Sequence, residues 1–194
     1  MKPSLNTFAT LTTNALENFP QAIERAELVK LVVLDVDGVL TDGALYVGQD
    51  GKESIKVFDS LDGHGIKLLA STGIKFAIIS GRKSTMVEAR AKELGIDFVF
   101  MAVKDKLATL NELLKDLQLG LQDCAAVGDD WPDLPVMSRV QLAAAPAQAH
   151  PEVLRIAHFV ATRKGGNGAV REICDLILKA QGHYDRLLKD AFAS

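Results

Sequence analysis

Short apolar runs alternate along the chain with segments of helical periodicity. Six apolar runs predict buried strands of a parallel sheet, at residues 31–34, 74–79, 98–102, 124–127, 140–144 and 158–161. Apolar residues spaced three or four apart predict helices at residues 64–71, 84–94, 107–117, 134–137, 151–156 and 169–180. This alternation indicates an α/β fold, with a single Rossmann-like parallel sheet and helices on both of its faces.

Three segments depart from the alternation. Residues 1–26 predict a polar lead followed by a helix that begins near Asn14. Residues 44–58 predict a β-hairpin, because the strand-like stretches ALYV and SIKVF flank a turn that contains Asp-Gly. Residues 183–194 are expected as a C-terminal tail. The domain itself is therefore expected over residues 27–182, with no room for a second domain.

Composition narrows the choice of partners. The net charge is −3 and aromatic residues make up 6% of the chain, which argues against binding to nucleic acid or to an anionic membrane. No apolar run approaches the roughly 20 residues of a membrane span, and the N-terminus lacks the apolar core of a signal peptide. Cys124 and Cys174 are expected as reduced, buried thiols of a cytoplasmic protein.

Polar and charged residues follow the ends of four predicted strands. They are Asp35 and Asp37 after the first strand, Ser80, Gly81 and Arg82 after the second, Lys106 after the third, and Asp129, Asp130 and Asp133 after the fourth. Because the carboxyl ends of parallel strands meet at one edge of a sheet, these residues are expected to converge there. Clustered carboxylates repel one another unless a cation is present, and a set of oxygen ligands suits Mg²⁺. The hydroxyl of Ser80 and the ammonium of Lys106 suit a phosphoryl group. The sequence therefore predicts a site for phosphate and magnesium.

Each of these motifs also has an ordinary interpretation. Asp-x-Asp-Gly is a common turn, Ser-Gly-Arg is ordinary loop chemistry, and a single lysine is most often a solvated surface residue. Lys106, however, lies at the start of a predicted helix, where a cation opposes the helix dipole unless an anion binds there too. The joint occurrence of these motifs at successive strand ends favours the functional interpretation.

The same residues resemble a known family. LVVLDVDGVLTDG, IISGR, Lys106 and VGDDWPDLPVM resemble the four motifs of the haloacid dehalogenase superfamily of phosphohydrolases, in that order. The hairpin ALYVGQDGKESIKVF, the loop FDSLDGHGIKLL, the stretch GRKSTMVEARAKELGI and the ending KGGNGAVREICDLIL are similar to one branch. That branch is the 3-deoxy-D-manno-octulosonate 8-phosphate phosphatases, which have no cap domain and act in lipopolysaccharide precursor synthesis. The resemblance covers about residues 25–182.

The resemblance implies an aspartyl-phosphate route. Asp35 would be the nucleophile, and Asp37 would protonate the leaving oxygen and then take a proton from water. Mg²⁺ would bind Asp35, Asp129 and the backbone carbonyl of Asp37. The phosphoryl oxygens would be held by Ser80, Gly81 and Lys106. Lys106 and the metal shell would be oriented by Asp130 and Asp133.

The resemblance also implies a sugar-acid substrate and an oligomer. Arg82, and after it Arg90, are the candidates to bind the substrate carboxylate. The residues expected to border the sugar are Phe58, Asp59, Ser60, Leu61 and Asp62. Many family members have an arginine where this chain has Leu61, which leaves another nonulosonate (sialic-acid-like) phosphate open as the substrate. A homotetramer is expected, in which a neighbour's hairpin covers each site, and the neighbour's C-terminal tail is a second candidate to cover it.

Other classes also use carboxylates on a parallel sheet. A signalling receiver domain carries its phosphoacceptor on strand three, but the third predicted strand of this chain ends in Phe100, Met101 and Ala102, without an acid. A phosphomutase shares the Asp-x-Asp pair, but it normally needs a cap domain. A descendant that only binds would have lost Asp35, Asp37 or Asp129, and all three are present.

Overall fold

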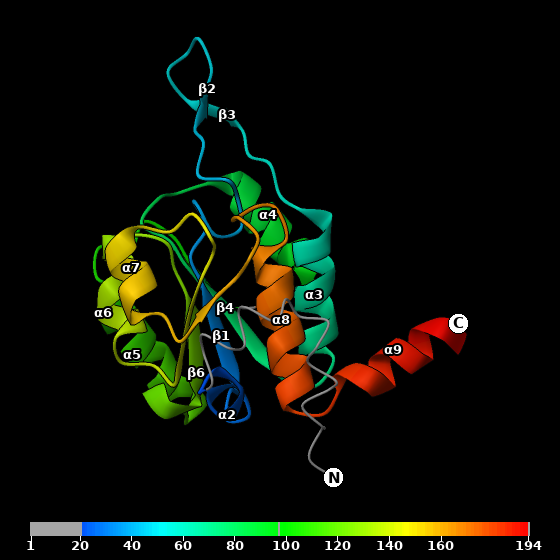
Figure 1. Ribbon diagram of the computed structural model, residues 1–194. Coiled ribbons are helices and arrows are strands. Elements are labelled where there is room, and N and C mark those ends of the chain that lie inside the picture. Colours follow the sequence, from blue (N-terminus) through cyan, green and yellow to red (C-terminus); the bar gives the residue numbers. More distant parts are fainter. Residues whose placement is uncertain (1–20, 97, 194) are drawn as a thin grey trace.

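A six-stranded parallel sheet forms the centre of the molecule (Figure 1). The structure is a computed structural model, and it describes residues 21–96 and 98–193. The strands are β1 (Leu31–Leu34), β4 (Lys75–Ile79), β5 (Phe98–Phe100), β6 (Cys124–Val127), β7 (Leu142–Ala145) and β8 (Phe159–Val160). Their order across the sheet is β5-β4-β1-β6-β7-β8, and every neighbouring pair is parallel. The predicted α/β class and parallel sheet are confirmed.

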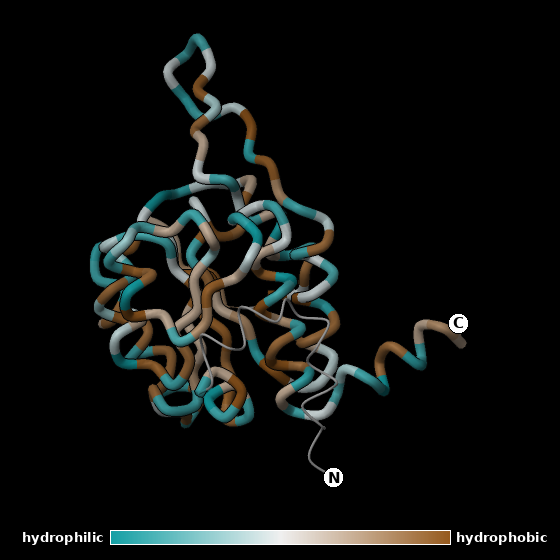
Figure 2. The backbone as a smooth tube through the Cα atoms, in the orientation of Figure 1, coloured by the Kyte–Doolittle hydropathy of each residue, from teal (hydrophilic) through white to brown (hydrophobic). Residues whose placement is uncertain are grey.

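Helices cover both faces of this sheet. One face carries α2 (Ala22–Ala26), α3 (Ser60–Ala70), α4 (Thr85–Leu94) and α8 (Ala169–Ala180). The other carries α5 (Lys106–Leu117), α6 (Leu134–Met137) and α7 (Pro151–Ile156). Two short 3₁₀ turns, η2 (Leu121–Asp123) and η3 (Trp131–Asp133), flank β6. The strands and the inward sides of the helices are hydrophobic, whereas many outer turns are hydrophilic (Figure 2).

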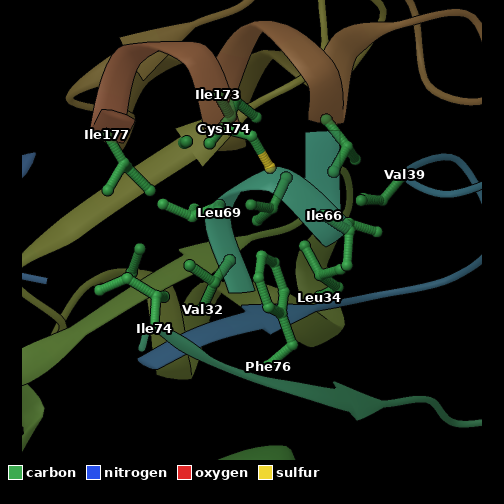
Figure 3. Close-up of a cluster of buried hydrophobic side chains, with 14 of the residues drawn as sticks. Val32, Leu34, Val39, Ile66, Leu69, Ile74, Phe76, Ile173, Cys174 and Ile177 are labelled. Atoms are coloured by element: carbon green, nitrogen blue, oxygen red, sulfur yellow. The ribbon is translucent and has the colours of Figure 1, made fainter. Parts of the chain in front are cut away.

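The alternation of side chains along β1 builds the core on each face. Val32 and Leu34 point to the face that carries α3 and α8, and Leu31 and Val33 point to the other face. Figure 3 shows side chains of β1, β4, α3 and α8 meeting in one buried cluster, with Phe76 below the two helices. Because both faces of β1 are buried, its apolar run is continuous. Cys124 and Cys174 are buried and free, as predicted.

The predicted hairpin forms a separate two-stranded sheet. Strand β2 (Tyr46–Val47) pairs with β3 (Glu53–Ile55) in antiparallel fashion. The hairpin projects beyond the end of the molecule where β1 ends (Figure 1). Its apolar side chains are exposed, among them Val47 and Ile55.

Several helix boundaries differ from the predicted ones. Helix α3 begins at Ser60 rather than near residue 64, because the Asp59 side chain accepts hydrogen bonds from the N–H groups of Leu61 and Asp62. Helix α5 begins one residue earlier than predicted, at Lys106, and ends at Leu117 as predicted, where Gln118 takes the left-handed conformation.

The two ends of the described chain are both helical. Residues 184–193, which were expected as a tail, form helix α9 (Tyr184–Ala193), and this helix projects away from the body (Figure 1). The predicted first helix falls partly outside the described residues, which contain only its end as α2. No described helix is long and apolar enough to cross a membrane.

Candidate active site

The loop after β1 carries the first two predicted site residues. The N–H of Asp35 donates to the carbonyl of Val127 (3.0 Å), which continues the ladder between β1 and β6 and fixes the backbone of Asp35. The chain then turns sharply at Gly38, whose φ is +87°. A Cβ at Gly38 would overlap the carboxylate of Asp129. Glycine at this position therefore allows the loop of β1 and the loop of β6 to touch.

Three carboxylates converge at the ends of the neighbouring strands β1 and β6. One oxygen each from Asp35, Asp129 and Asp133 lies within 4.8 Å of the others. Asp35 and Asp129 were predicted to share this place as metal ligands. Asp133 is buried and completes the group, whereas the side chain of Asp37 turns to a different set of partners.

Lys106 lies at the first residue of α5 and reaches into this cluster. Its Nζ donates to Oδ1 of Asp35 and to Oδ1 of Asp133, each at 2.7 Å. The other oxygen of Asp133 accepts from the backbone N–H groups of Asp129 (3.1 Å) and Asp130 (3.4 Å). Asp133 therefore holds both the lysine and the loop after β6, while the side chain of Asp130 is exposed.

The electrostatics of the cluster show a shortage of positive charge. Burial is the largest cause that raises the pKa of Asp35 to about 6; the charge of Asp133 acts in the same direction, and Lys106 opposes both. Burial raises the pKa of Asp129 to about 7, with the charges of Asp35, Asp133 and Asp130 acting in the same direction. Burial acts to lower the pKa of Lys106, but the neighbouring carboxylates of Asp133 and Asp35 outweigh burial, so the pKa of Lys106 is raised. One ammonium thus faces several carboxyl groups, which suits a further cation.

The end of β4 supplies the next predicted group. Ser80 is buried beside β1, and its Oγ accepts a hydrogen bond from the N–H of Arg82 (3.3 Å). The guanidinium of Arg82 is partly exposed. Its Nε lies 3.4 Å from Oδ2 of Asp37, and its Nη2 lies 3.4 Å from Oε2 of Glu53. Arg82 is therefore next to Asp37 and open to solvent.

Two residues of the hairpin, Glu53 and Lys56, reach the site although they were not predicted. Nζ of Lys56 donates to Oδ1 of Asp37 (2.5 Å) and lies 2.8 Å from Oε1 of Glu53. Both residues come from the strand that leads back from the hairpin. A signal was present, since a hairpin that leaves the chain just after Asp37 must pass over the same edge of the sheet.

Gln148 was missed as well. Its Nε2 donates to the carbonyl of Gly38 (2.7 Å), and its Oε1 accepts from the N–H of Gly165 (2.9 Å). The N–H of Gly166 donates to the carbonyl of Val39 (3.0 Å). The glycine-rich segment before α8 therefore packs on the loop of β1, where a Cβ at Gly165 would overlap the Gly38 carbonyl. No pattern around Gln148 itself indicated this contact.

The residues expected to contact the sugar lie in different surroundings, some exposed and some packed against the core. Leu61 is exposed, and Phe58 packs against the core. Asp62 is 1% exposed, and its oxygens accept from the N–H groups of Gly168 and Arg171 at the start of α8. The structure thus uses Asp62 to join α3 to α8 and does not bring it to the carboxylate cluster.

Arg90 is engaged between α3 and α4. Its Nη1 donates to Oε2 of Glu93 (2.7 Å), and its Nη2 donates to the carbonyl of Asp59 (3.4 Å). Its guanidinium lies so close to Gly63 that a Cβ there would overlap it. These contacts account for the position of Arg90 in the packing of the two helices, and its contact with substrate stays a prediction.

Comparison with known proteins decides the family. A family profile described as haloacid dehalogenase-like hydrolase matches residues 45–141. The 3-deoxy-D-manno-octulosonate 8-phosphate phosphatase of Yersinia pestis is 48% identical over 159 residues, which is 82% of this chain and 84% of the relative. The chain belongs to this phosphatase family. It is accordingly an enzyme, a phosphoric monoester hydrolase.

Solved structures of similar phosphatases have the same fold. A protein from Pseudomonas syringae that is named a probable YrbI family phosphatase is 50% identical, with a TM-score of 0.87, and the match covers 89% of this chain and 98% of that one. The 3-deoxy-D-manno-octulosonate 8-phosphate phosphatase of Moraxella catarrhalis is 40% identical, with a TM-score of 0.85, over 88% and 97% of the two chains. That structure is a complex with a magnesium ion, a phosphate ion and a KDO molecule.

Proposed function

We propose that this phosphatase hydrolyses 3-deoxy-D-manno-octulosonate 8-phosphate to the free sugar acid and inorganic phosphate, with Mg²⁺ as cofactor. The observation that carries the proposal is the arrangement around Asp35. A mostly buried carboxylate at a strand end lies 2.7 Å from a lysine ammonium and within 4.8 Å of two further carboxylates. This arrangement suits a nucleophile that acts beside a metal ion and a phosphoryl group.

The donor set fits magnesium. Asp35 and Asp129 offer carboxylate oxygens from adjacent strands, and burial together with neighbouring carboxylates raises the pKa of both. Asp133 is already occupied by Lys106 and two backbone N–H groups. Asp35, Asp129 and the backbone carbonyl of Asp37 would therefore hold the ion. A bound Mg²⁺ supplies positive charge that draws in the phosphoryl oxygens and stabilises the charge that develops on them.

The chemistry of the chain's own residues then runs in two steps. A carboxylate oxygen of Asp35 attacks phosphorus, and the bond from phosphorus to the sugar oxygen breaks. Asp37 gives its proton to that leaving oxygen. Water next attacks the aspartyl phosphate and gives a proton to Asp37, which restores Asp35 and releases phosphate.

Lys106 and Ser80 would bind the transferring group. Two donors of the Lys106 ammonium point to Asp35 and Asp133, which leaves the third for a phosphoryl oxygen. Ser80 and the backbone at Gly81 follow the strand next to β1 and would bind another oxygen. Asp133 fixes Lys106 for this purpose, whereas the exposed Asp130 would act on the metal surroundings through its loop.

The proposed substrate carries a carboxylate in addition to its phosphate, and this second negative charge needs a partner in the site. Arg82 presents a partly exposed guanidinium beside Asp37, where a substrate carboxylate would meet it. The relatives from Yersinia pestis and Moraxella catarrhalis carry the name of this substrate, and the latter was solved with a KDO molecule. Leu61, exposed at the start of α3, keeps another nonulosonate phosphate as the second candidate.

A substrate panel tests the proposal. Phosphate release is measured from 3-deoxy-D-manno-octulosonate 8-phosphate, from a sialic-acid phosphate and from glucose 6-phosphate, each with Mg²⁺ and with excess chelator. We expect the highest kcat/KM on the first substrate and loss of turnover in chelator. Preference for the neutral sugar phosphate would refute the sugar-acid assignment, and full activity in chelator would refute the metal.

A further inference from the structure

Lys56 is a buried lysine whose charge the proposed mechanism does not use. Its side chain is 2% exposed, although it comes from the hairpin and not from the core. A buried ammonium is unfavourable unless anions pair with it. Lys56 has two such partners, Oδ1 of Asp37 at 2.5 Å and Oε1 of Glu53 at 2.8 Å. The chain therefore holds a cation directly against the carboxyl group proposed as the acid and base.

The contacts of Lys56 restrict the carboxyl group of Asp37. Lys56 binds Oδ1, and Arg82 lies 3.4 Å from Oδ2, so the plane of the group is defined from both sides. Glu53 in turn contacts both Lys56 and Arg82. An ammonium has no lone pair and cannot accept a proton, so Oδ1 stays its acceptor. Arg82 contacts Oδ2 only as an ion pair at 3.4 Å, without the short hydrogen bond that Lys56 makes to Oδ1, so Oδ2 is the oxygen left to carry the proton to the leaving group.

We propose that Lys56, anchored by Glu53, is a positioning residue that aims Oδ2 of Asp37 at the leaving oxygen of the substrate. The proposal rests on the proposed function, since it assigns a task to Lys56 in that reaction. Misplacement of a reacting group by about 1 Å costs on the order of 100-fold in rate. Because Lys56 and Glu53 belong to the hairpin, the placement of the hairpin would set the placement of the acid.

Direct substrate binding is the main alternative for Lys56. Its side chain is almost fully covered, and two carboxylates already balance its charge. Arg82, by contrast, is 46% exposed and holds its partners only at 3.4 Å. A substrate anion would therefore meet Arg82 before Lys56, and these contacts favour the positioning role.

Two aryl phosphates separate the roles. Phenyl phosphate and p-nitrophenyl phosphate are similar in size, but phenolate is the poorer leaving group and needs a proton more. Lys56→Met should lower kcat/KM for phenyl phosphate on the order of 100-fold and for p-nitrophenyl phosphate less than about fivefold. Lys56→Arg, which keeps the charge, should restore most of the loss. Lys52→Met, an exposed lysine of the same hairpin, is the matched control and should behave as the wild type.

The ratio of the two losses guards against misfolding. A smaller folded fraction lowers both activities equally, so a purely structural role leaves the ratio unchanged. Equal losses on both substrates would overturn the proposal. A second experiment places Lys56→Met in an Asp37→Asn background. If Lys56 acts through Asp37, the double variant should have a kcat/KM on phenyl phosphate less than about threefold below that of Asp37→Asn alone. Full multiplication of the two losses would also overturn the proposal.

The wild type separates this proposal from the proposed function. The phosphatase mechanism is supported if the wild type hydrolyses both aryl phosphates, if chelator stops this hydrolysis and if Asp35→Asn abolishes it. This result does not depend on Lys56. With that result in hand, equal losses in Lys56→Met refute only the positioning role. A wild type without such activity would overturn both.

Discussion

Arg82 is the residue that we propose to govern substrate choice. Its guanidinium stands between Asp37 and Glu53 and is open to solvent. Because a guanidinium binds a carboxylate through charge-assisted hydrogen bonds, Arg82 would favour substrates that carry a carboxylate.

Arg82→Ala tests this role. We expect kcat/KM for the sugar acid phosphate to fall on the order of 30-fold, because one charge-assisted contact is lost, with a much smaller fall for p-nitrophenyl phosphate. Steady-state kinetics on both substrates measure the difference, and Lys83→Ala, at the exposed neighbouring position, is the control. Equal losses on the two substrates would assign Arg82 to the phosphoryl group or to the fold instead.

At the scale of elements, Asp62 joins two helices through a buried carboxyl group. It lies in the first turn of α3 and accepts from the N–H groups of Gly168 and Arg171 at the start of α8. Burial raises the pKa of Asp62 to about 6 from the usual 3.8, although these hydrogen bonds oppose the rise. Between pH 3.8 and about pH 6, Asp62 keeps its proton in the folded protein but has released it in the unfolded chain. Stability therefore falls as pH rises through this window.

Asp62→Asn removes this titration. In the wild type the free energy of unfolding should fall between about pH 4 and about pH 6, by on the order of 2 kcal/mol from this group. Asp62→Asn should show a flatter dependence over the same range, even if it is less stable overall. Urea denaturation at several pH values gives both curves, and parallel curves would contradict the assignment.

The elements that the sequence predicts well are those that packing alone specifies. The runs at 124–127 and 169–180 coincide with β6 and α8, because a buried strand and an amphipathic helix each have a distinct apolar period. Helix α9 was missed, because its apolar face, which includes the exposed Phe192, packs little against the body. The start of α3 was placed late because the Asp59 cap depends on local geometry that no apolar period shows.

The candidate site divides in a similar way. Asp35, Lys106 and Asp129 could be predicted to converge, because each follows a strand of the same parallel sheet. For Lys56 the sequence offers only the coarse signal that the hairpin leaves the chain just after Asp37, and the contact itself depends on how the hairpin folds back. Gln148 could not be predicted, because its contacts depend on how the β7–α7 loop folds back over that edge. Loop contacts of this kind carry no periodic signal in the sequence.

At the scale of the whole molecule, two parts project with apolar side chains exposed. The hairpin exposes Val47 and Ile55, and α9 exposes Leu188 and Phe192. Exposed apolar surface and free strand edges are features of surfaces that associate. The expected homotetramer, with hairpins from several subunits together, stays a prediction that these surfaces support.

Light scattering tests the assembly. The full chain should have the mass of a tetramer at working concentration, and the double substitution Val47→Ser with Ile55→Ser should shift it to smaller species, because apolar contact area is lost. Lys52→Ser, in the turn of the hairpin, is the control. An active wild-type monomer would contradict the prediction.

The central claim is that Asp35 is the group that attacks phosphorus within the cluster of Lys106, Asp129 and Asp133. Asp35→Asn keeps the shape of the side chain and the hydrogen bond of its backbone to Val127, but the amide is a poor nucleophile. The most direct measurement compares phosphate release from 3-deoxy-D-manno-octulosonate 8-phosphate by the wild type and by Asp35→Asn at saturating Mg²⁺, with circular dichroism of both proteins. The account predicts an intact fold and a loss of about 10⁴-fold or more in kcat. A folded Asp35→Asn protein with activity within about tenfold of the wild type would contradict it.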